Sequence, residues 1–247
     1  MHRNPLTIAI DGPSGSGKSS VSKSVARELG LAYLDTGAMY RALAWWVLER
    51  GLDPQDHAVI AQAARDLPLE ISTDPGEATV RVDGTDITTD IRTTRISSRV
   101  SAVASNLDVR AELASRQRAL ITQARTEHGG MVAEGRDITT VVAPDAEHRI
   151  LLTASEEARL ARRATELHGS AAAEALDATK DQIIRRDRDD AAVSAFFEPA
   201  KGVVGVDTSD LSFEQSVQAV LDVVRGKVST PTSPLQRTLP TERDRET

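Results

Sequence analysis

Eight residues near the N-terminus constrain the fold of this chain more than any other part of its 247-residue sequence. Residues 12–19 read Gly-Pro-Ser-Gly-Ser-Gly-Lys-Ser, which fits the pattern G-x-x-x-x-G-K-[S/T] completely. They lie between a short apolar run, residues 6–11, and a stretch of helical pattern, residues 18–29. A strand, a glycine-rich turn and a helix in this order are the context that the pattern requires. The segment therefore predicts a phosphate-binding loop.

Each residue type in this loop has a physical task. Glycines let the backbone curl so that its N–H groups point at phosphate oxygens, and the following helix adds its positive end. Lys18 supplies a positive charge to the β- and γ-phosphates, and the hydroxyl of Ser19 can serve as a ligand of Mg²⁺. We therefore expect ATP with Mg²⁺ to be bound by Gly12, Pro13, Ser14, Gly15, Ser16, Gly17, Lys18, Ser19 and Ser20.

The alternation of strand and helix patterns predicts an α/β fold, with a P-loop NTPase-type parallel sheet flanked by helices. Further parallel strands are expected at four short apolar runs, residues 31–34, 131–134, 148–153 and 203–207. Residues 68–90 break this rhythm, because three brief strand-like pieces are separated by Asp-Pro-Gly and Asp-Gly turns. This predicts a small antiparallel three-stranded insert, with helices following at 92–105 and 107–127.

Charge and composition exclude several classes of function. The formal net charge of −7 argues against a large nucleic-acid surface. The absence of cysteine excludes a disulfide framework, a thiolate metal site and a cysteine nucleophile, and it fits a reducing cytoplasm. No segment approaches the ~18 consecutive apolar residues of a membrane span, and the N-terminal apolar run is too short for a signal peptide. We expect a cytoplasmic monomer with neither nucleic acid nor membrane as a partner.

Phosphate-binding loops occur in GTPases, in motor ATPases and in small-molecule kinases. A GTPase reads guanine with Asn-Lys-x-Asp, but the two asparagines of this chain, Asn4 and Asn106, do not precede a lysine. A motor ATPase usually ends an apolar strand in a metal-holding aspartate, whereas the run 148–153 ends in Thr153 and Ala154. The GTPase interpretation fails, and the motor interpretation is weak.

Three further segments contain charged and polar residues that are candidates for a functional site. Residues 35–41 read DTGAMYR after the second predicted strand, and residues 134–137 read EGRD after the third. Because ligands of open α/β sheets bind at the carboxyl ends of the strands, both face the crevice of the phosphate-binding loop. Arg186-Asp187-x-x-Asp190 lies late in a predicted helix, residues 174–190. Taken singly, these segments could also be a helix cap or surface charge pairs.

Together with the loop, the segments DTGAMYR, AEGRDITTVV and VDTSDLS resemble the bacterial cytidylate kinases, from about residue 6 to 226. The resemblance implies a nucleoside monophosphate kinase that transfers the γ-phosphoryl group of ATP to CMP, and to dCMP, giving CDP or dCDP and ADP. Two alternatives remain open at this point. One is a kinase for another nucleoside monophosphate, UMP or AMP, and the other is a non-catalytic nucleotide-binding module.

The resemblance also implies a domain organisation. Residues 1–65 and 106–227 would form the core, and the insert, residues 66–105, would bind the nucleoside monophosphate. A lid would lie at about 159–192. Residues 228–247 are polar, rich in Pro and Thr, and without period, so we expect a disordered tail.

Residue roles follow from the same resemblance. Thr36, Arg41 and Arg136 would hold the CMP phosphate, with Tyr40 in the same substrate site, and Asp137, Arg110 and Ser101 would read the base. Asp190 would contact the sugar. Arg162, Arg163, Arg186 and Arg188 would close over the ATP phosphates, so that the catalytic set is Lys18, Arg136, Arg162 and Arg186. The chain has Val193 where the family usually has an arginine, which leaves the preference between CMP and dCMP open.

Overall fold

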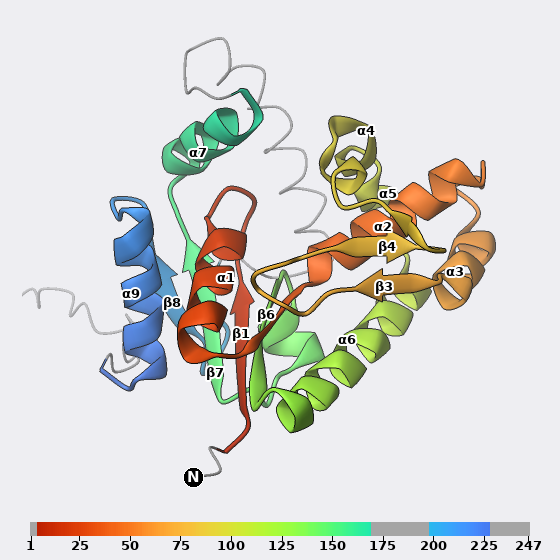
Figure 1. Ribbon diagram of the computed structural model, residues 1–247. Helices are drawn as coiled ribbons and strands as arrows, with labels where there is room; N and C mark the ends of the chain where they lie inside the picture. The colour runs from red at the N-terminus through yellow and green to blue at the C-terminus, as the bar shows by residue number, and fades with distance from the viewer. Residues whose placement is uncertain (1–3, 169–197, 228–247) are drawn as a thin grey trace, which may run out of the picture.

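A parallel sheet of five strands forms the centre of the computed structural model, which describes residues 4–168 and 198–227. The strand order is β2-β6-β1-β7-β8 (Figure 1). The strands are β1 (Leu6–Asp11), β2 (Ala32–Asp35), β6 (Gly130–Gly135), β7 (His148–Thr153) and β8 (Val204–Asp207). Each of the five runs predicted from the sequence is therefore a strand, within one residue at either end.

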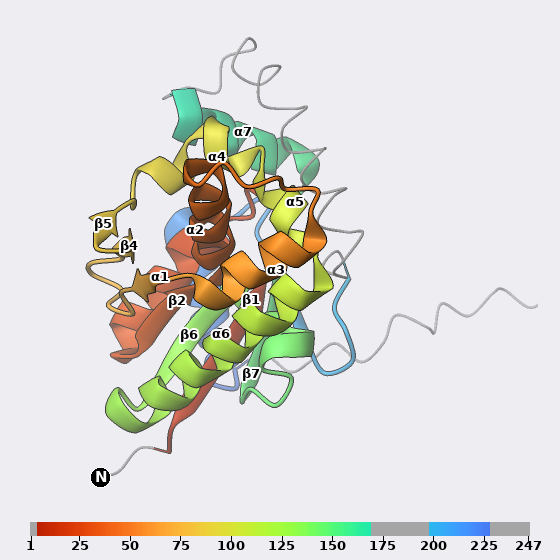
Figure 2. The ribbon, with the colours of Figure 1, turned by 90° about the vertical axis from the view of Figure 1, so that its right-hand side faces the viewer.

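The two faces of the sheet are covered by different helices. Side chains of β1 alternate between the faces, because Ile8 and Ile10 pack with α1 (Lys18–Leu29) and α9 (Phe213–Val224), whereas Ala9 packs with the opposite layer. That layer contains α2 (Thr36–Glu49), α3 (His57–Asp66) and α6 (Leu107–Glu127). Helices α3 and α6 lie side by side across it (Figure 2). The middle strand β1 is thus buried on both faces, and it delivers the loop that follows it to a fixed place.

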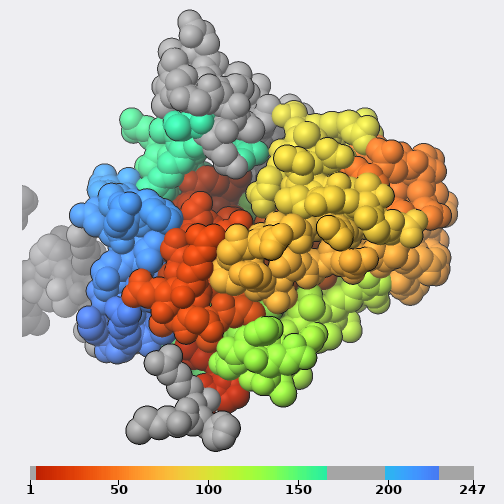
Figure 3. All heavy atoms as spheres, in the orientation of Figure 1, coloured from red at the N-terminus to blue at the C-terminus, as the bar shows by residue number. Residues whose placement is uncertain are grey.

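A second, antiparallel sheet lies between α3 and α6 in the chain. Its order is β3 (Leu69–Ile71), β4 (Val80–Val82) and β5 (Thr85–Asp86). This confirms the expected three-stranded element. The loop between β3 and β4 is tied to the main sheet, because the Tyr33 N–H donates to the Thr73 carbonyl over 2.8 Å. Figure 3 shows the surfaces of the red N-terminal segment and of this yellow segment in direct contact.

The third strand is shorter than the predicted piece at residues 86–90. The Ile87 N–H still donates to the Val80 carbonyl over 2.9 Å, but Asp86 Oδ1 accepts the next N–H, that of Thr88, over 2.9 Å and turns the backbone away from β4. The side chain of Asp86 therefore ends the strand where the sequence pattern alone continues it.

The helix predicted at 92–105 is instead three short pieces. They are a 3₁₀ turn (Asp90–Arg92), α4 (Thr94–Ser97) and α5 (Val100–Ala104). The buried apolar residues are Ile91, Ile96, Val100 and Val103, and the five-residue step from Ile91 to Ile96 does not fit a helix of period 3.6. Breaks in the backbone keep all four side chains on the core.

The expected lid, at about 159–192, lies partly outside the described residues. Helix α7 (Glu156–His168) follows β7 and stands beyond the carboxyl ends of the strands (Figure 1). The predicted helix at 174–190 and the predicted disordered tail at 228–247 lie outside the described residues. Within residues 4–168 and 198–227, every helix is too short or too polar to cross a membrane.

Candidate active site

The phosphate-binding loop sits where β1 meets α1, as the motif requires. A Cβ at Gly12 would lie 2.2 Å from the Leu152 carbonyl oxygen, so only glycine fits where the loop leaves the sheet. Lys18 Nζ donates to the Pro13 carbonyl over 3.3 Å, which folds the lysine back over the loop. Lys18 and Ser19, the first two residues of α1, line the same cavity beside the loop.

Glu134, at the carboxyl end of β6, is a site residue that the sequence reasoning did not assign. Its Oε1 accepts hydrogen bonds from Ser19 Oγ over 2.6 Å and from the Tyr33 hydroxyl over 3.2 Å, and the residue is 2% exposed. Burial raises the pKa of the Glu134 carboxyl, the neighbouring Asp35 raises it further, and Lys18 opposes both. The apolar run 131–134 ends in this acid. The sequence analysis looked for an acid at the end of a strand only at the run 148–153, and so it did not assign Glu134.

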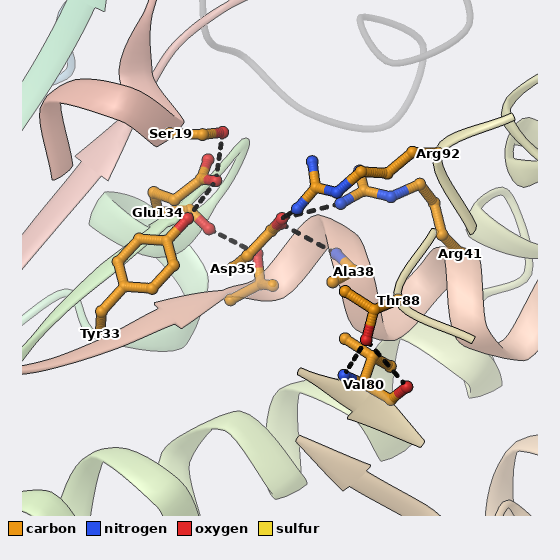
Figure 4. A network of polar contacts seen from close by, with 10 residues as sticks. Ser19, Tyr33, Asp35, Ala38, Arg41, Val80, Thr88, Arg92 and Glu134 are labelled. Carbon is orange, nitrogen blue, oxygen red and sulfur yellow. Dashed lines mark hydrogen bonds and ion pairs between the residues drawn. The ribbon is translucent and has the colours of Figure 1, made fainter. Parts of the chain in front are cut away.

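Asp35, the N-cap residue of α2, holds two cations of the site, Arg41 and Arg92 (Figure 4). Its Oδ1 accepts the Ala38 N–H over 2.9 Å, so the carboxylate caps the helix, which is one of the interpretations that the sequence left open for this segment. Its Oδ2 lies 2.8 Å from Arg41 Nη2 and 3.7 Å from Arg92 Nη2. Burial works to raise the pKa of Asp35, but Arg41 and Arg92 outweigh it and lower that pKa below its ordinary value. Arg92, to which the sequence analysis gave no role, thus joins the site from the 3₁₀ turn.

Thr36 and Arg136 are brought to the loop by the pairing of β6 with β1 and β2. Arg136 Nη1 donates to the Gly12 carbonyl, and Thr36 Oγ1 donates to the Glu134 carbonyl over 2.8 Å. A Cβ at Gly135 would lie 2.5 Å from Thr36 Oγ1, so the glycine allows this close approach. The predicted phosphate-holding residues therefore stand next to the phosphate-binding loop.

Asp137 and Arg110 form the other end of the site. Arg110 Nη2 lies 2.5 Å from Asp137 Oδ2, and both side chains are mostly buried. Arg110 is in the first turn of α6, whose start is fixed by Asn106, which accepts the N–H groups of the next turn. Burial raises the pKa of Asp137 and Arg110 opposes that effect. Burial also raises the pKa of the Tyr40 phenol to about 12, with Asp137 adding to the shift, so Tyr40 stays protonated.

One cavity joins these groups. From α5 it is lined by Val100 and Ala104 rather than by the predicted Ser101. The other lining residues come from the loop, from α2, from α6 and from the end of β6: Lys18, Ser19, Asp35, Thr36, Gly37, Tyr40, Arg41, Arg110, Glu134, Gly135, Arg136 and Asp137. The phosphate-binding loop, Arg41, Arg136 and the Asp137–Arg110 pair therefore face the same space.

Arg162, on α7, lies behind the loop. Its guanidinium donates to the Ser16 carbonyl over 3.3 Å, to Thr208 Oγ1 over 3.0 Å and to the Thr208 carbonyl over 2.6 Å. These contacts tie α7 to the loop and to the segment after β8. Of the other predicted lid and sugar residues, Arg186, Arg188 and Asp190 lie outside the described residues.

The fold and the site define a P-loop nucleotide-binding protein of the kinase type, with a cavity beside the loop that is lined by several cationic side chains. A family model described as "Cytidylate kinase" matches residues 8–226 of this chain. The cytidylate kinase of Cutibacterium acnes is 49% identical over 230 residues, which are 91% of this chain and 98% of the relative. The cytidylate kinase of Streptomyces avermitilis is 46% identical over 223 residues, 90% of this chain and 94% of the relative. The chain belongs to the cytidylate kinase family, which confirms the resemblance and does not favour the alternatives.

The role of Asp35 as the anion between the arginines predicts a loss of stability when its charge is removed. Asp35→Asn keeps an oxygen for the helix cap but removes the carboxylate beside Arg41 and Arg92. We expect the free energy of unfolding at pH 7 to fall by about 2 kcal/mol, since a hydrogen bond between charged groups contributes about 1.5–3 kcal/mol. Urea denaturation measures this difference.

Asp56 provides the matched control, because it caps α3 at an exposed position, where its Oδ1 accepts the Ala58 and Val59 N–H groups. Asp56→Asn should cost less than about 0.5 kcal/mol, because asparagine and aspartate are comparable helix caps. The pKa of Asp35 is lowered on folding, so its contribution is present above the unfolded value of about 3.9 and is lost as the pH falls below it. If both variants lower the free energy of unfolding by the same small amount, the ion pairs of Asp35 with Arg41 and Arg92 do not stabilise the fold.

Proposed function

We propose that this chain transfers the γ-phosphoryl group of ATP to CMP, giving CDP and ADP, and that it also accepts dCMP. The observation that carries the proposal is a second set of cations, Arg41 and Arg136, lining the same cavity as Lys18 of the phosphate-binding loop. A module that only binds a nucleotide does not need a second phosphate clamp beside the first. Membership of the cytidylate kinase family supports the same acceptor.

The chemistry of phosphoryl transfer explains why cationic side chains line this cavity. The acceptor is a phosphate whose second pKa is about 6, so it is already an anion and a nucleophile at neutral pH and requires no general base. The obstacle is the repulsion between two polyanions, which cations held in fixed positions reduce. In this proposal Arg41, Arg136 and Thr36 hold the acceptor phosphate, and Lys18 holds the donor phosphates.

The loop also fits a divalent cation. Ser19 donates its hydroxyl proton to Glu134, which leaves the lone pairs of Ser19 Oγ for a metal, and oxygen ligands are those that Mg²⁺ prefers. We propose that Ser19 is a ligand of Mg²⁺ and that the neighbouring Glu134 supports the site with its buried carboxylate. When bound, the metal would neutralise charge on the β- and γ-phosphates.

Base recognition is proposed for the acid–arginine pair. Cytosine carries an exocyclic amino donor, which Asp137 can accept, and ring acceptors, to which Arg110 can donate. Arg110 favours the ionised form that Asp137 needs for this role. Tyr40 adds a protonated phenol to the wall of the same cavity. Ser101 is assigned to the base by the family resemblance alone.

The remaining roles are proposed from the family pattern. Arg162 would act on the ATP phosphates from α7, where its guanidinium already donates to the Ser16 carbonyl of the loop. Arg186 would act on the ATP phosphates from the lid, about 159–192, and Asp190 on the sugar. The antiparallel insert, residues 66–105, would close the acceptor site over a core formed by residues 1–65 and 106–227.

Turnover with ATP and Mg²⁺ across CMP, dCMP, UMP and AMP tests the proposal. We expect CMP and dCMP to be phosphorylated much faster than UMP or AMP. Lys18→Ala is the control for contaminating kinases, and it should lower kcat by at least a hundredfold, about 2.7 kcal/mol of barrier, while the melting temperature is kept. A Lys18→Ala protein that keeps kcat within about tenfold would rule out the role of this lysine. Equal rates with all four acceptors would rule out the base preference.

Asp137→Asn tests how the base is read. Asparagine keeps the shape but can present its amide N–H₂ as a donor, which suits the O4 acceptor of uracil. The preference for CMP over UMP in kcat/KM should fall by about 10–150-fold, because a charged hydrogen bond of about 1.5–3 kcal/mol is lost. Steady-state kinetics with both acceptors measures the ratio. If both acceptors lose activity equally, Asp137 acts on the fold or on Arg110 rather than on the base.

A further inference from the structure

Asp11 is a buried carboxylate at the end of β1, directly before the phosphate-binding loop, and it reaches across to the segment that carries Asp137. Its Oδ1 accepts the Ile138 N–H over 2.9 Å, and its Oδ2 accepts the Thr139 N–H over 2.8 Å and the Thr139 hydroxyl over 2.6 Å. Asp11 is 2% exposed. All three of these partners are donors, so the ionised carboxylate is the form that matches them.

The segment that Asp11 contacts is a short π-helical turn, Ile138–Val142, that the sequence analysis did not predict. The Asp137 carbonyl accepts the N–H groups of Val141 and Val142, so Asp137 stands at the position of the N-cap. The N–H groups at the start of such a turn have no partner within it and require an acceptor from outside.

An aspartate in this position ordinarily accepts those N–H groups with its own side chain. Asp35 and Asp56 do so at the starts of α2 and α3. Asp137 makes no such bond, and its Oδ2 meets Arg110 in the cavity instead. At this turn Asp11, from the neighbouring strand β1, accepts the N–H groups that Asp137 leaves without a side-chain acceptor.

We propose that Asp11 caps the turn in place of Asp137 and thereby positions Asp137 for base recognition. Asp11 is a positioning residue, because it acts on substrate choice through another side chain. When Asp11 cannot accept, the uncapped N–H groups draw the Asp137 carboxylate back onto its own turn and away from the base. This inference rests on the proposed reading of cytosine by Asp137.

The parallel register of β1 and β6 explains why Asp11 can do this. Asp11 pairs with Gly135, so its side chain starts level with the end of β6 and reaches the turn that follows. In the other direction, Arg136 from the end of β6 donates to the Gly12 carbonyl. The Asp11 carboxylate and the Arg136 guanidinium thus both join the loop that would hold ATP to the segment that would hold the acceptor.

Asp11→Asn tests the proposal most strongly, since asparagine offers one acceptor and turns an N–H₂ group toward donors. We expect the preference for CMP over UMP in kcat/KM to fall at least tenfold, toward the value of Asp137→Asn. Asp11→Asn combined with Asp137→Asn should show the preference of Asp137→Asn alone, because the first residue acts through the second.

Thr139 supplies a milder pair of variants in case Asp11→Asn does not fold. Thr139→Val keeps the shape but removes the hydroxyl donor to Asp11, and the preference should fall by about three- to fivefold. Thr139→Ser keeps the hydroxyl and should stay within about twofold of the parent protein. The KM for ATP and the melting temperature are measured alongside, because a purely structural role would change these without changing the base preference.

Two results would overturn the inference separately from the proposed function. If Asp137→Asn lowers the preference for CMP but Thr139→Val and Asp11→Asn leave it unchanged, Asp11 serves the phosphate-binding loop or the fold alone. If the double variant loses preference well beyond Asp137→Asn, Asp11 acts by another route. If Asp137→Asn itself leaves the preference for CMP unchanged, Asp137 does not recognise the base, and the inference about Asp11 fails with it. The Asp137→Asn variant therefore distinguishes this outcome from the two above.

Discussion

The parallel pairing of β1 with β6 is the constraint on which the rest of the site depends. The register runs from Leu6 opposite Gly130 to Asp11 opposite Gly135, so both strands end at the same level. The phosphate-binding loop leaves one strand there, and the Arg136-Asp137 pair leaves the other. Because both strands are buried, a shift of register would expose core side chains, and this fixes the distance between the two halves of the site.

Charge is the second constraint on the site. Several cations surround one cavity, and in the described residues the buried carboxylates Asp35 and Glu134 and the mostly buried Asp137 stand among them. Each carboxylate is held by a hydroxyl or an arginine, so the cations are kept in place without being neutralised completely. An anionic ligand such as a nucleotide phosphate supplies the missing negative charge, which is why a site of this kind binds phosphates strongly.

Much of this could be predicted from the sequence, because local patterns determine it. The loop motif, the buried strands and the cap at Asp35 are short-range features, and the family resemblance added Arg41, Arg136 and Asp137. What could not be predicted depends on contacts between distant segments. Glu134 gains its role because β6 lies next to β1, which brings it to Ser19.

The same reason explains the irregular segments. The breaks between residues 90 and 104 follow from a five-residue spacing that only the packed core makes necessary. The π-helical turn at Ile138–Val142 depends on Asp11, which is more than a hundred residues away in the chain. Local sequence patterns cannot predict a cap that comes from such a distant residue.

A crystal structure with CMP, Mg²⁺ and a non-hydrolysable ATP analogue would show whether the cations folded over the loop form a clamp for two phosphate groups. We expect Arg136 to leave the Gly12 carbonyl, so that its guanidinium and that of Arg41 lie about 2.7–2.9 Å from the CMP phosphate oxygens. Lys18 would lie at a similar distance from the terminal phosphate of the analogue. A CMP phosphate bound elsewhere, with Arg136 still on the Gly12 carbonyl, would show that these cations do not form the clamp.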